Sequence, residues 1–282
     1  MAKTAKKASA PAPVAKKTAP TAVATVPKRS TAVADVAAFE EMSGVGFEDT
    51  SSQDIIIPRV SILQPLSPQL VKTKPEFIKG ANAGQIVDTG INKAFDDVTL
   101  VPCYYARVYL EWAPRESGKG LVKNHGVDDS IMNETERDEE TNRDVLPNGN
   151  YIVETATYYC LLIDGEDVRP VFLPMASTQL KNARKWMTLL TAEKLTGSNG
   201  KRFTPPMFYR AWVGSSAPQS NAKGDWHGWR FEAGDAIMDI DPSGDLLEKA
   251  RNFYQQAKEG LVKGDVSIDE GSESNGEEKA GF

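Results

Sequence analysis

Two short stretches place an arginine between aromatic residues at alternating positions. They are "YARVY" at 105–109 and "FYRAW" at 208–212. Residues two apart in a β-strand point to the same face of the sheet. A buried arginine is unfavourable unless it is paired, so we expect both of these faces to be exposed or to line a groove. The alternating residues are Tyr105, Arg107, Tyr109, Phe208, Arg210 and Trp212.

A third stretch, "KGDWHGWRFE" at 223–232, concentrates aromatics beside basic residues and glycines. Trp229 and Phe231 fall on one face of a strand, and Arg230 falls on the other. Trp226 precedes them by three residues. Since large aromatics normally pack inside a core, their place in a positively charged, glycine-rich stretch favours a binding role.

Basic side chains accompany these aromatics. Lys181, Arg184 and Lys185 have the i, i+3, i+4 spacing of one helix face, so they predict a basic ridge. Aromatic rings stack on bases of any sequence, at about 1–3 kcal/mol per base, and cations neutralise phosphates. The sequence therefore predicts contacts to single-stranded nucleic acid. The alternative is that the aromatic residues pack in a core and the arginines pair with carboxylates. The basic residues expected in glycine-rich turns are Lys119, Lys123, Lys201 and Arg202.

The elements that must position these residues are mostly strands. β-Branched and aromatic runs predict strands, the longest at 97–115, and a hairpin over 149–175 that turns at Asp164 and Gly165. Helices are expected over 177–194 and 241–262. The predicted fold class is α+β and β-rich: a single OB-like barrel or small-sheet domain at 54–262, with two helices and disordered tails.

The chain has 282 residues and a net charge of −6 that is distributed unevenly. Residues 1–30 carry +7 within a basic arm and linker at 1–50 that we expect to be disordered. Such an arm either contacts phosphates or acts as a solubilising tail. Residues 265–282 carry −5 and predict a disordered acidic tail that ends in Phe282.

Residues 128–144 contain eight acids and two arginines, and they predict a solvated acidic loop between strands. A carboxylate metal site is less favoured there, because no DxDxDG-type spacing occurs. The charge of −8 over residues 31–264 speaks against a nucleic-acid-binding protein.

No HExxH, GxSxG, P-loop or GxGxxG motif occurs, so we expect neither an enzyme nor a cofactor or metal. A nuclease that uses the acids of 128–144 is the weakest alternative left. His125 and His227 are expected in turns with solvent contacts. Cys103 and Cys160 predict free thiols and a cytoplasmic protein. No apolar run is long enough for a membrane span, so no membrane partner is expected.

The tail "GSESNGEEKAGF" and the segments "IPRVSILQPLSPQL", "VPCYYARVYLEWAPR" and "STQLKNARKW" resemble the single-stranded-DNA-binding proteins of tailed bacteriophages. The resemblance implies an OB-fold barrel that binds single-stranded DNA in phage DNA replication, recombination and repair, within the host cytoplasm. It also implies that Phe282 anchors the tail on replication proteins such as a polymerase, helicase or primase. The implied competitors for the groove, which also serve in partner binding, are Asp269, Glu277 and Glu278.

Two features depart from this family pattern. The basic arm is not part of it, and the acidic stretch 128–144 speaks against a simple positive groove. The alternative function is that of a virion or scaffold-type structural interaction protein, which binds no nucleic acid. The sequence leaves open whether the protein forms a homo-oligomer. The two readings differ in a titration, because bound oligo(dT) should quench tryptophan emission only in a strand-binding protein.

Overall fold

The computed structural model describes residues 39, 42–43, 45–46, 48–49, 56–221 and 224–264. The chain divides into two units, Met1–Asp49 and Thr50–Phe282. In the first unit, the described residues form short turns, one of which is closed by the Met42 N–H donating to the carbonyl of Phe39 at 3.1 Å. The second unit carries every strand discussed below.

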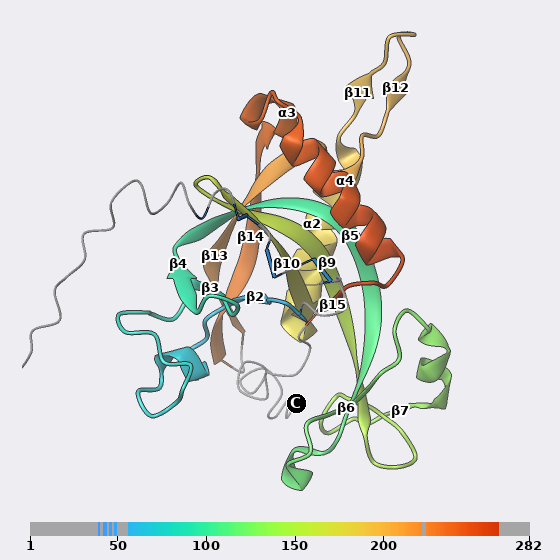
Figure 1. The fold of residues 1–282 in the computed structure, drawn as a ribbon. Coiled ribbons are helices and arrows are strands. Elements are labelled where there is room, and N and C mark those ends of the chain that lie inside the picture. Colours follow the sequence, from blue (N-terminus) through green and yellow to red (C-terminus); the bar gives the residue numbers. More distant parts are fainter. Residues whose placement is uncertain are drawn as a thin grey trace, which may run out of the picture. The chain divides into compact units, whose positions relative to one another are not determined.

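The second unit is a strand-rich α+β structure with a curled sheet, as the fold class predicted (Figure 1). The helices are α2 (Leu180–Ala192), α3 (Ile237–Ile240) and α4 (Asp245–Lys258), and the 3₁₀ turns are η1 (Pro68–Leu70), η2 (Arg115–Ser117), η3 (Asp129–Glu134), η4 (Ser177–Gln179) and η5 (Met207–Tyr209). The strands are β1 (Ile56–Ile57), β2 (Val60–Ile62), β3 (Ile86–Asp88), β4 (Lys93–Phe95), β5 (Asp97–Trp112), β6 (Leu121–Asn124), β7 (Glu136–Arg137), β8 (Asp144–Val145), β9 (Tyr151–Asp164), β10 (Asp167–Ala176), β11 (Leu195–Thr196), β12 (Arg202–Phe203), β13 (Arg210–Asn221), β14 (Gly224–Ala236) and β15 (Lys263–Gly264).

The long antiparallel strands β5 and β9 form the centre of the main sheet. β13 pairs with the start of β5 and β6 with its end, while β10 and β8 pair with β9 on the other side. The β9–β10 hairpin turns at Gly165 and Glu166, one residue later than predicted, because Asp164 still pairs with Asp167. At the sheet edge, the Phe172 N–H of β10 donates to the Pro58 carbonyl at 3.0 Å and so joins β10 to the segment before β2.

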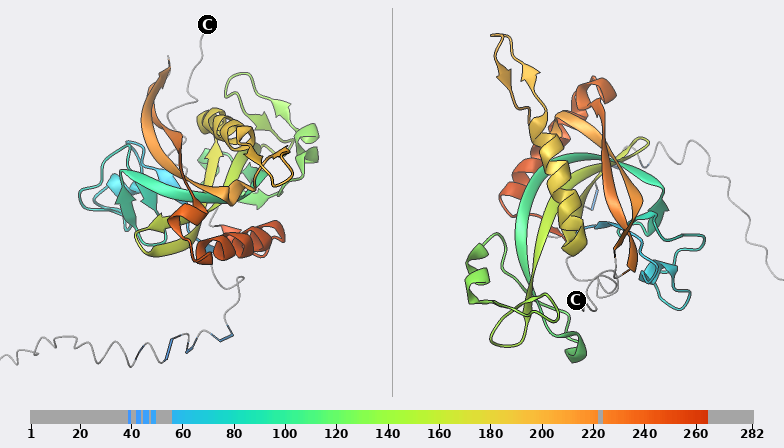
Figure 2. Two further views of the ribbon diagram at one scale, coloured as in Figure 1. Left: turned by 90° about the horizontal axis from the view of Figure 1, so that it is seen from above. Right: turned by 180° about the vertical axis from the view of Figure 1, so that it is seen from behind.

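Two hydrophobic cores lie on opposite faces of this sheet (Figures 1 and 2). The concave face packs against α2, whose Ala183, Trp186 and Leu190 are buried. The opposite face packs against α4, whose Leu246, Ala250, Phe253 and Ala257 are buried at helical spacing. Both predicted helices are therefore present, and each buries one apolar stripe.

A β-bulge in β5 decides which side chains face the concave side. Before it, Val98 and Leu100 belong to the core under α2; the pairing register with β9 then shifts between Pro102 and Tyr104. Proline has no N–H for a ladder hydrogen bond, so its place in a central strand fits a bulge. One extra residue reverses the alternation, and the odd-numbered Tyr105 then packs against the core under α2.

Residues 128–144 form η3, β7 and β8 between β6 and β9. Asp128 caps η3, since its carboxylate accepts from the Ser130 N–H at 3.0 Å, and Arg137 pairs with Asp144 at 2.7 Å. Among the described residues, no three acidic, histidine or cysteine side chains are grouped to hold a metal ion. No helix in the described part of the chain is long and apolar enough to cross a membrane.

Candidate functional site

A groove of about 190 Å³ lies between α2 and the strands β5 and β9. Both sides of it come from predicted site elements: the "YARVY" strand and the basic helix. The aromatic and aliphatic side chains form its apolar part, and two arginines stand among them. Its lining residues are Tyr105, Arg107, Ala156, Tyr158, Leu180, Ala183, Arg184 and Met187.

The bulge in β5 places Tyr105 and Arg107 in this groove. Tyr105 lies opposite Tyr158 and Arg107 opposite Ala156 in the β5–β9 register. The Tyr105 and Tyr158 rings are 4.9 Å apart between centroids. Tyr105 is only partly buried, so part of its ring stays open to a ligand. The prediction that Tyr105 and Arg107 share an accessible face is consistent with this geometry.

The base of the groove is fixed by Tyr158, which is fully buried. Its hydroxyl donates to the Ala183 carbonyl at 2.8 Å and so joins β9 to α2. Burial raises the pKa of Tyr158, so the hydroxyl stays protonated and continues to donate. The width of the groove is therefore set by a buried hydrogen bond between its two sides.

The two arginines flank one carboxylate. Arg107 Nε lies 3.2 Å and Arg184 Nη2 lies 3.9 Å from Glu154 Oε1, and the two arginine side chains are 47% and 65% exposed. The hydrogen bond that Arg107 donates to the Tyr105 hydroxyl oxygen is the largest cause that raises the pKa of Arg107, and the charge of Glu154 acts in the same direction. Because both guanidiniums are largely exposed, each can contact a further anion from the solvent side. Glu154 Oε1 is buried, so the two arginines also balance its charge.

The remaining basic residues of α2 extend this positive rim. Lys181 and Lys185 are exposed, as the predicted basic ridge requires. Leu180 and Met187 of the groove were missed as site residues, because their helical spacing also fits a buried stripe. The arrangement as a whole can hold a flat apolar group beside Tyr105 and an anionic group at the arginines.

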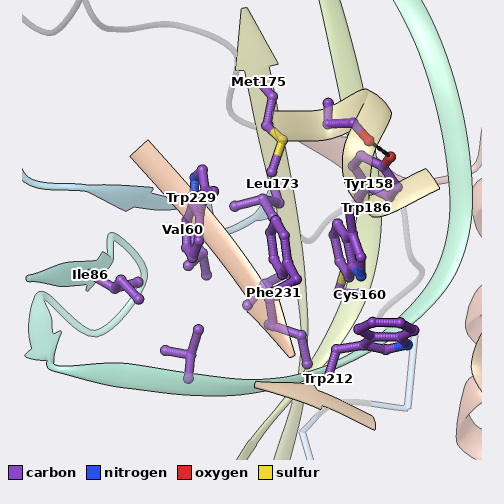
Figure 3. Close-up of a cluster of buried hydrophobic side chains, with 14 of the residues drawn as sticks. Val60, Ile86, Tyr158, Cys160, Leu173, Met175, Trp186, Trp212, Trp229 and Phe231 are labelled. Atoms are coloured by element: carbon purple, nitrogen blue, oxygen red, sulfur yellow. Dashed lines mark hydrogen bonds between the residues drawn. The ribbon is translucent and has the colours of Figure 1, made fainter. Parts of the chain in front are cut away.

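The structure corrects the expected position of two tryptophans. Trp212 is 3% and Trp229 is 5% exposed, and both belong to the core under α2 (Figure 3). Trp229 and Phe231 do share a face, with centroids 5.4 Å apart and nearly parallel rings. That face points into the curl of the sheet and is covered by Trp186, whose ring stacks on Phe231 at 3.8 Å. These rings are therefore packing residues and cannot stack on bases in this conformation.

Tyr109 and Phe208 are also not exposed as expected. Tyr109 is 7% exposed and packs with Leu146 and Ile152 at the far end of β5. Phe208 lies in η5 and packs against the core under α4, 6.2 Å from the Tyr254 ring. The predicted common face of Phe208 and Trp212 is wrong, because a 3₁₀ turn and a bulge between Arg210 and Trp212 interrupt the alternation.

Arg210, Trp226 and Arg230 have partners in the protein. Arg210 pairs with Glu193 at 2.6 Å, which fits the alternative that this arginine is paired with a carboxylate. Trp226 is partly buried and donates its indole N–H to Gln219 Oε1 at 3.0 Å. Arg230 is 66% exposed beside Glu232. None of the three lines the groove.

The other basic candidates lie outside the groove lining, and all are exposed. Lys119 precedes β6, and Lys123 is within it, near the end of β5. Lys201 and Arg202 belong to the β11–β12 hairpin, which projects beyond α2 (Figure 2). The tail candidates Asp269, Glu277, Glu278 and Phe282 lie outside the described residues, as do residues 1–38.

The expectation that both histidines are solvent-facing turn residues is wrong. The His125 side chain is 11% exposed, and its Nε2 lies 2.8 Å from Glu111 Oε2. Glu111 also accepts hydrogen bonds from Asn150 at 2.6 Å and Asn148 at 3.3 Å. The Asn150 bond is the main cause that lowers the pKa of Glu111. His227 lies within β14, partly buried.

Most of the chain matches the model of a known protein family. Residues 27–263 match the model of a family described as Pam3 phage gp34-like protein. The match covers more than half of the 282 residues, including α2, α3, α4 and the strands from β1 to β14. No curated protein matches the chain, and no solved structure does.

Proposed function

Since the chain belongs to the Pam3 phage gp34-like family, we propose that this bacteriophage protein binds single-stranded DNA without sequence preference during phage replication or recombination. It would act in the host cytoplasm as a binding protein, not as an enzyme. The observation that supports the proposal is the groove that the part-exposed Tyr105 lines together with Arg107 and Arg184.

Each part of the groove suits one part of a nucleotide. A base can stack on the open face of Tyr105, and the apolar side chains of Leu180 and Met187 can contact its edge. The guanidiniums of Arg107 and Arg184 can bind the adjoining phosphates. With the arginines engaged by phosphates, only a ring and alkyl chains face the base, so the expected binding is independent of sequence.

The acidic tail completes the proposal. Residues 265–282 begin directly after β15 and carry −5, and the tail would compete with DNA for the basic groove. Its terminal Phe282 would recruit replication proteins. A homo-oligomer is compatible with this role.

The direct test is a titration of labelled oligo(dT) and of duplex DNA. We expect tighter binding to the single strand, weakening as salt rises. Arg107→Ala and Arg184→Ala should each lower the affinity about tenfold or more, because a hydrogen bond to a charged group contributes about 1.5–3 kcal/mol. Arg251→Ala is the matched control, because Arg251 is an exposed arginine on α4, beyond the opposite face of the sheet.

A virion or scaffold-type interaction protein is the second candidate. Burial of Trp212 and Trp229 favours it, since it removes two of the proposed base-stacking rings. Such a protein would show no oligonucleotide binding and would assemble on its own. Equal affinity of the wild type and both groove variants would also count against the groove as the DNA site.

A further inference from the structure

The β11–β12 hairpin combines positive charge with an exposed aromatic ring. Residues 194–204, "KLTGSNGKRFT", contain Lys194, Lys201 and Arg202 and no acidic residue. Phe203 is 47% exposed, whereas the aromatic residues predicted to stack on bases are at least partly buried. An exposed ring beside three cations combines the two kinds of group that bind single-stranded nucleic acid, a stacking surface and a phosphate contact.

The hairpin is held in a defined position. The Gly197 N–H donates to the Lys201 carbonyl at 2.9 Å, and Asn199 Oδ1 accepts from the Lys201 N–H at 3.0 Å. Leu195 lies opposite Phe203 in the register. At the base, Lys194 Nζ donates to the Thr191 carbonyl of α2 at 3.1 Å and to the Thr204 hydroxyl. The ring and charges are therefore presented on an ordered support.

The hairpin follows directly on the helix that lines the groove. Arg184 and the last residue of α2, Ala192, are eight positions apart, or about 12 Å along the helix axis. A nucleic-acid strand that leaves the groove along α2 toward its C-terminus would meet the hairpin next (Figure 2). A polyanion also fits the uncompensated positive charge of residues 194–204 better than an apolar protein partner does.

We propose that the β11–β12 hairpin is a second contact for single-stranded DNA, in which Phe203 stacks on a base and Lys201 and Arg202 bind the neighbouring phosphates. The inference rests on the proposed function and extends the site from the groove to the far end of α2. Strand-binding proteins contact about 4–16 nucleotides per domain, which is more than the groove alone can hold.

The test compares three variants on an oligo(dT) of about 16 nucleotides, a length within that range. Phe203→Leu keeps an apolar side chain but removes the ring, and it should weaken binding about fivefold or more. Phe203→Tyr keeps the ring and should bind like the wild type. Arg107→Ala, run alongside, reports on the groove, and circular dichroism checks that each variant is folded.

The outcomes separate the two proposals. Unchanged affinity of Phe203→Leu, together with weaker binding of Arg107→Ala, overturns the hairpin contact and leaves the groove. Equal losses in Phe203→Leu and Phe203→Tyr overturn base stacking at this position. If the wild type binds no oligonucleotide, both proposals are wrong.

Discussion

The side-chain amide of Gln64 exchanges two hydrogen bonds with the backbone of His227. Gln64 Nε2 donates to the His227 carbonyl at 2.9 Å, and Gln64 Oε1 accepts from the His227 N–H at 3.0 Å. Gln179 acts similarly, donating to the same carbonyl at 2.9 Å and accepting from the Trp229 N–H at 3.1 Å. Two glutamine side chains thus satisfy the free edge of β14, where a neighbouring strand would otherwise pair.

Gln64→Met should destabilise the protein by about 1–3 kcal/mol. Methionine has a similar length but cannot accept from the His227 N–H, and this part-buried donor then loses its protein partner. The free energy of unfolding from urea denaturation measures the effect.

Gln256→Met provides the control for this change. Gln256 is exposed on α4, so its replacement should leave the free energy of unfolding within about 0.5 kcal/mol of the wild type. Equal stability of Gln64→Met and the wild type would mean that Gln179 and water suffice to satisfy the β14 edge.

Trp212→Ala should destabilise the protein by about 3–5 kcal/mol, since it opens a cavity in the core under α2. A Trp212 on an exposed face or in a groove, as the sequence predicted, would instead be replaced with little loss of stability. Trp212→Phe should be far milder, because the indole N–H has no hydrogen-bond partner among the described residues. Thermal and urea unfolding distinguish the two variants, and a stable Trp212→Ala protein would show that this ring is not a packing residue.

The difference between Tyr105 and Trp212 shows what the sequence could and could not specify. Both have alternating aromatic and arginine neighbours, and both lie on the concave face of the sheet. Tyr105 follows the bulge and lies at the edge of the area covered by α2, whereas Trp212 lies beneath Trp186 at a centroid distance of 6.3 Å. The alternation of side chains along a strand predicts which residues share a face. Whether a helix covers that face depends on how the sheet curls in the tertiary structure.

The elements themselves were more predictable than the faces. Local periodicity, which is encoded in short windows of sequence, predicts the strand-rich fold class. It also predicts the long strand β5 and both major helices. The hydrogen bonds of Gln64 and the pair of His125 with Glu111 join residues far apart in sequence or across a turn, so no local pattern reveals them.

Glu111 should make the stability depend on pH in the acid range. Asn150, and then His125, hold the pKa of this carboxyl below its ordinary value of 4.5 in the folded protein. A lowered folded-state pKa means that the stabilisation is complete above about pH 4.5 and is lost as the pH falls through the folded value. Glu111→Gln should therefore be less stable than the wild type at about pH 7, and the two should converge in acid.

Urea unfolding at a series of pH values from about 7 to about 3 tests this dependence. Glu134→Gln is a suitable control, because Glu134 is exposed at the end of η3. A constant difference between wild type and Glu111→Gln across the series would assign the acid sensitivity to another group.

Deletion of residues 265–282 should tighten binding of single-stranded DNA at low salt. The tail carries −5, so its removal takes away a competitor for the basic groove, and the gain should shrink as salt screens the competition. Fluorescence anisotropy of a labelled oligonucleotide measures both conditions. A loss of affinity on deletion would exclude the tail as an internal mimic of DNA.

Replacing both groove arginines should reduce the salt dependence of binding by a predictable amount. Each phosphate contact to a single strand contributes about 0.7 to the slope of log K against log salt concentration. The double variant Arg107→Gln and Arg184→Gln should therefore lower the magnitude of this slope by about 1.4. The control double variant, Arg251→Gln with Lys258→Gln, removes the same net charge from the exposed face of α4. Because the two proteins have equal net charge, a smaller slope only in the groove variant would assign the phosphate contacts to the groove, whereas equal slopes would assign them elsewhere.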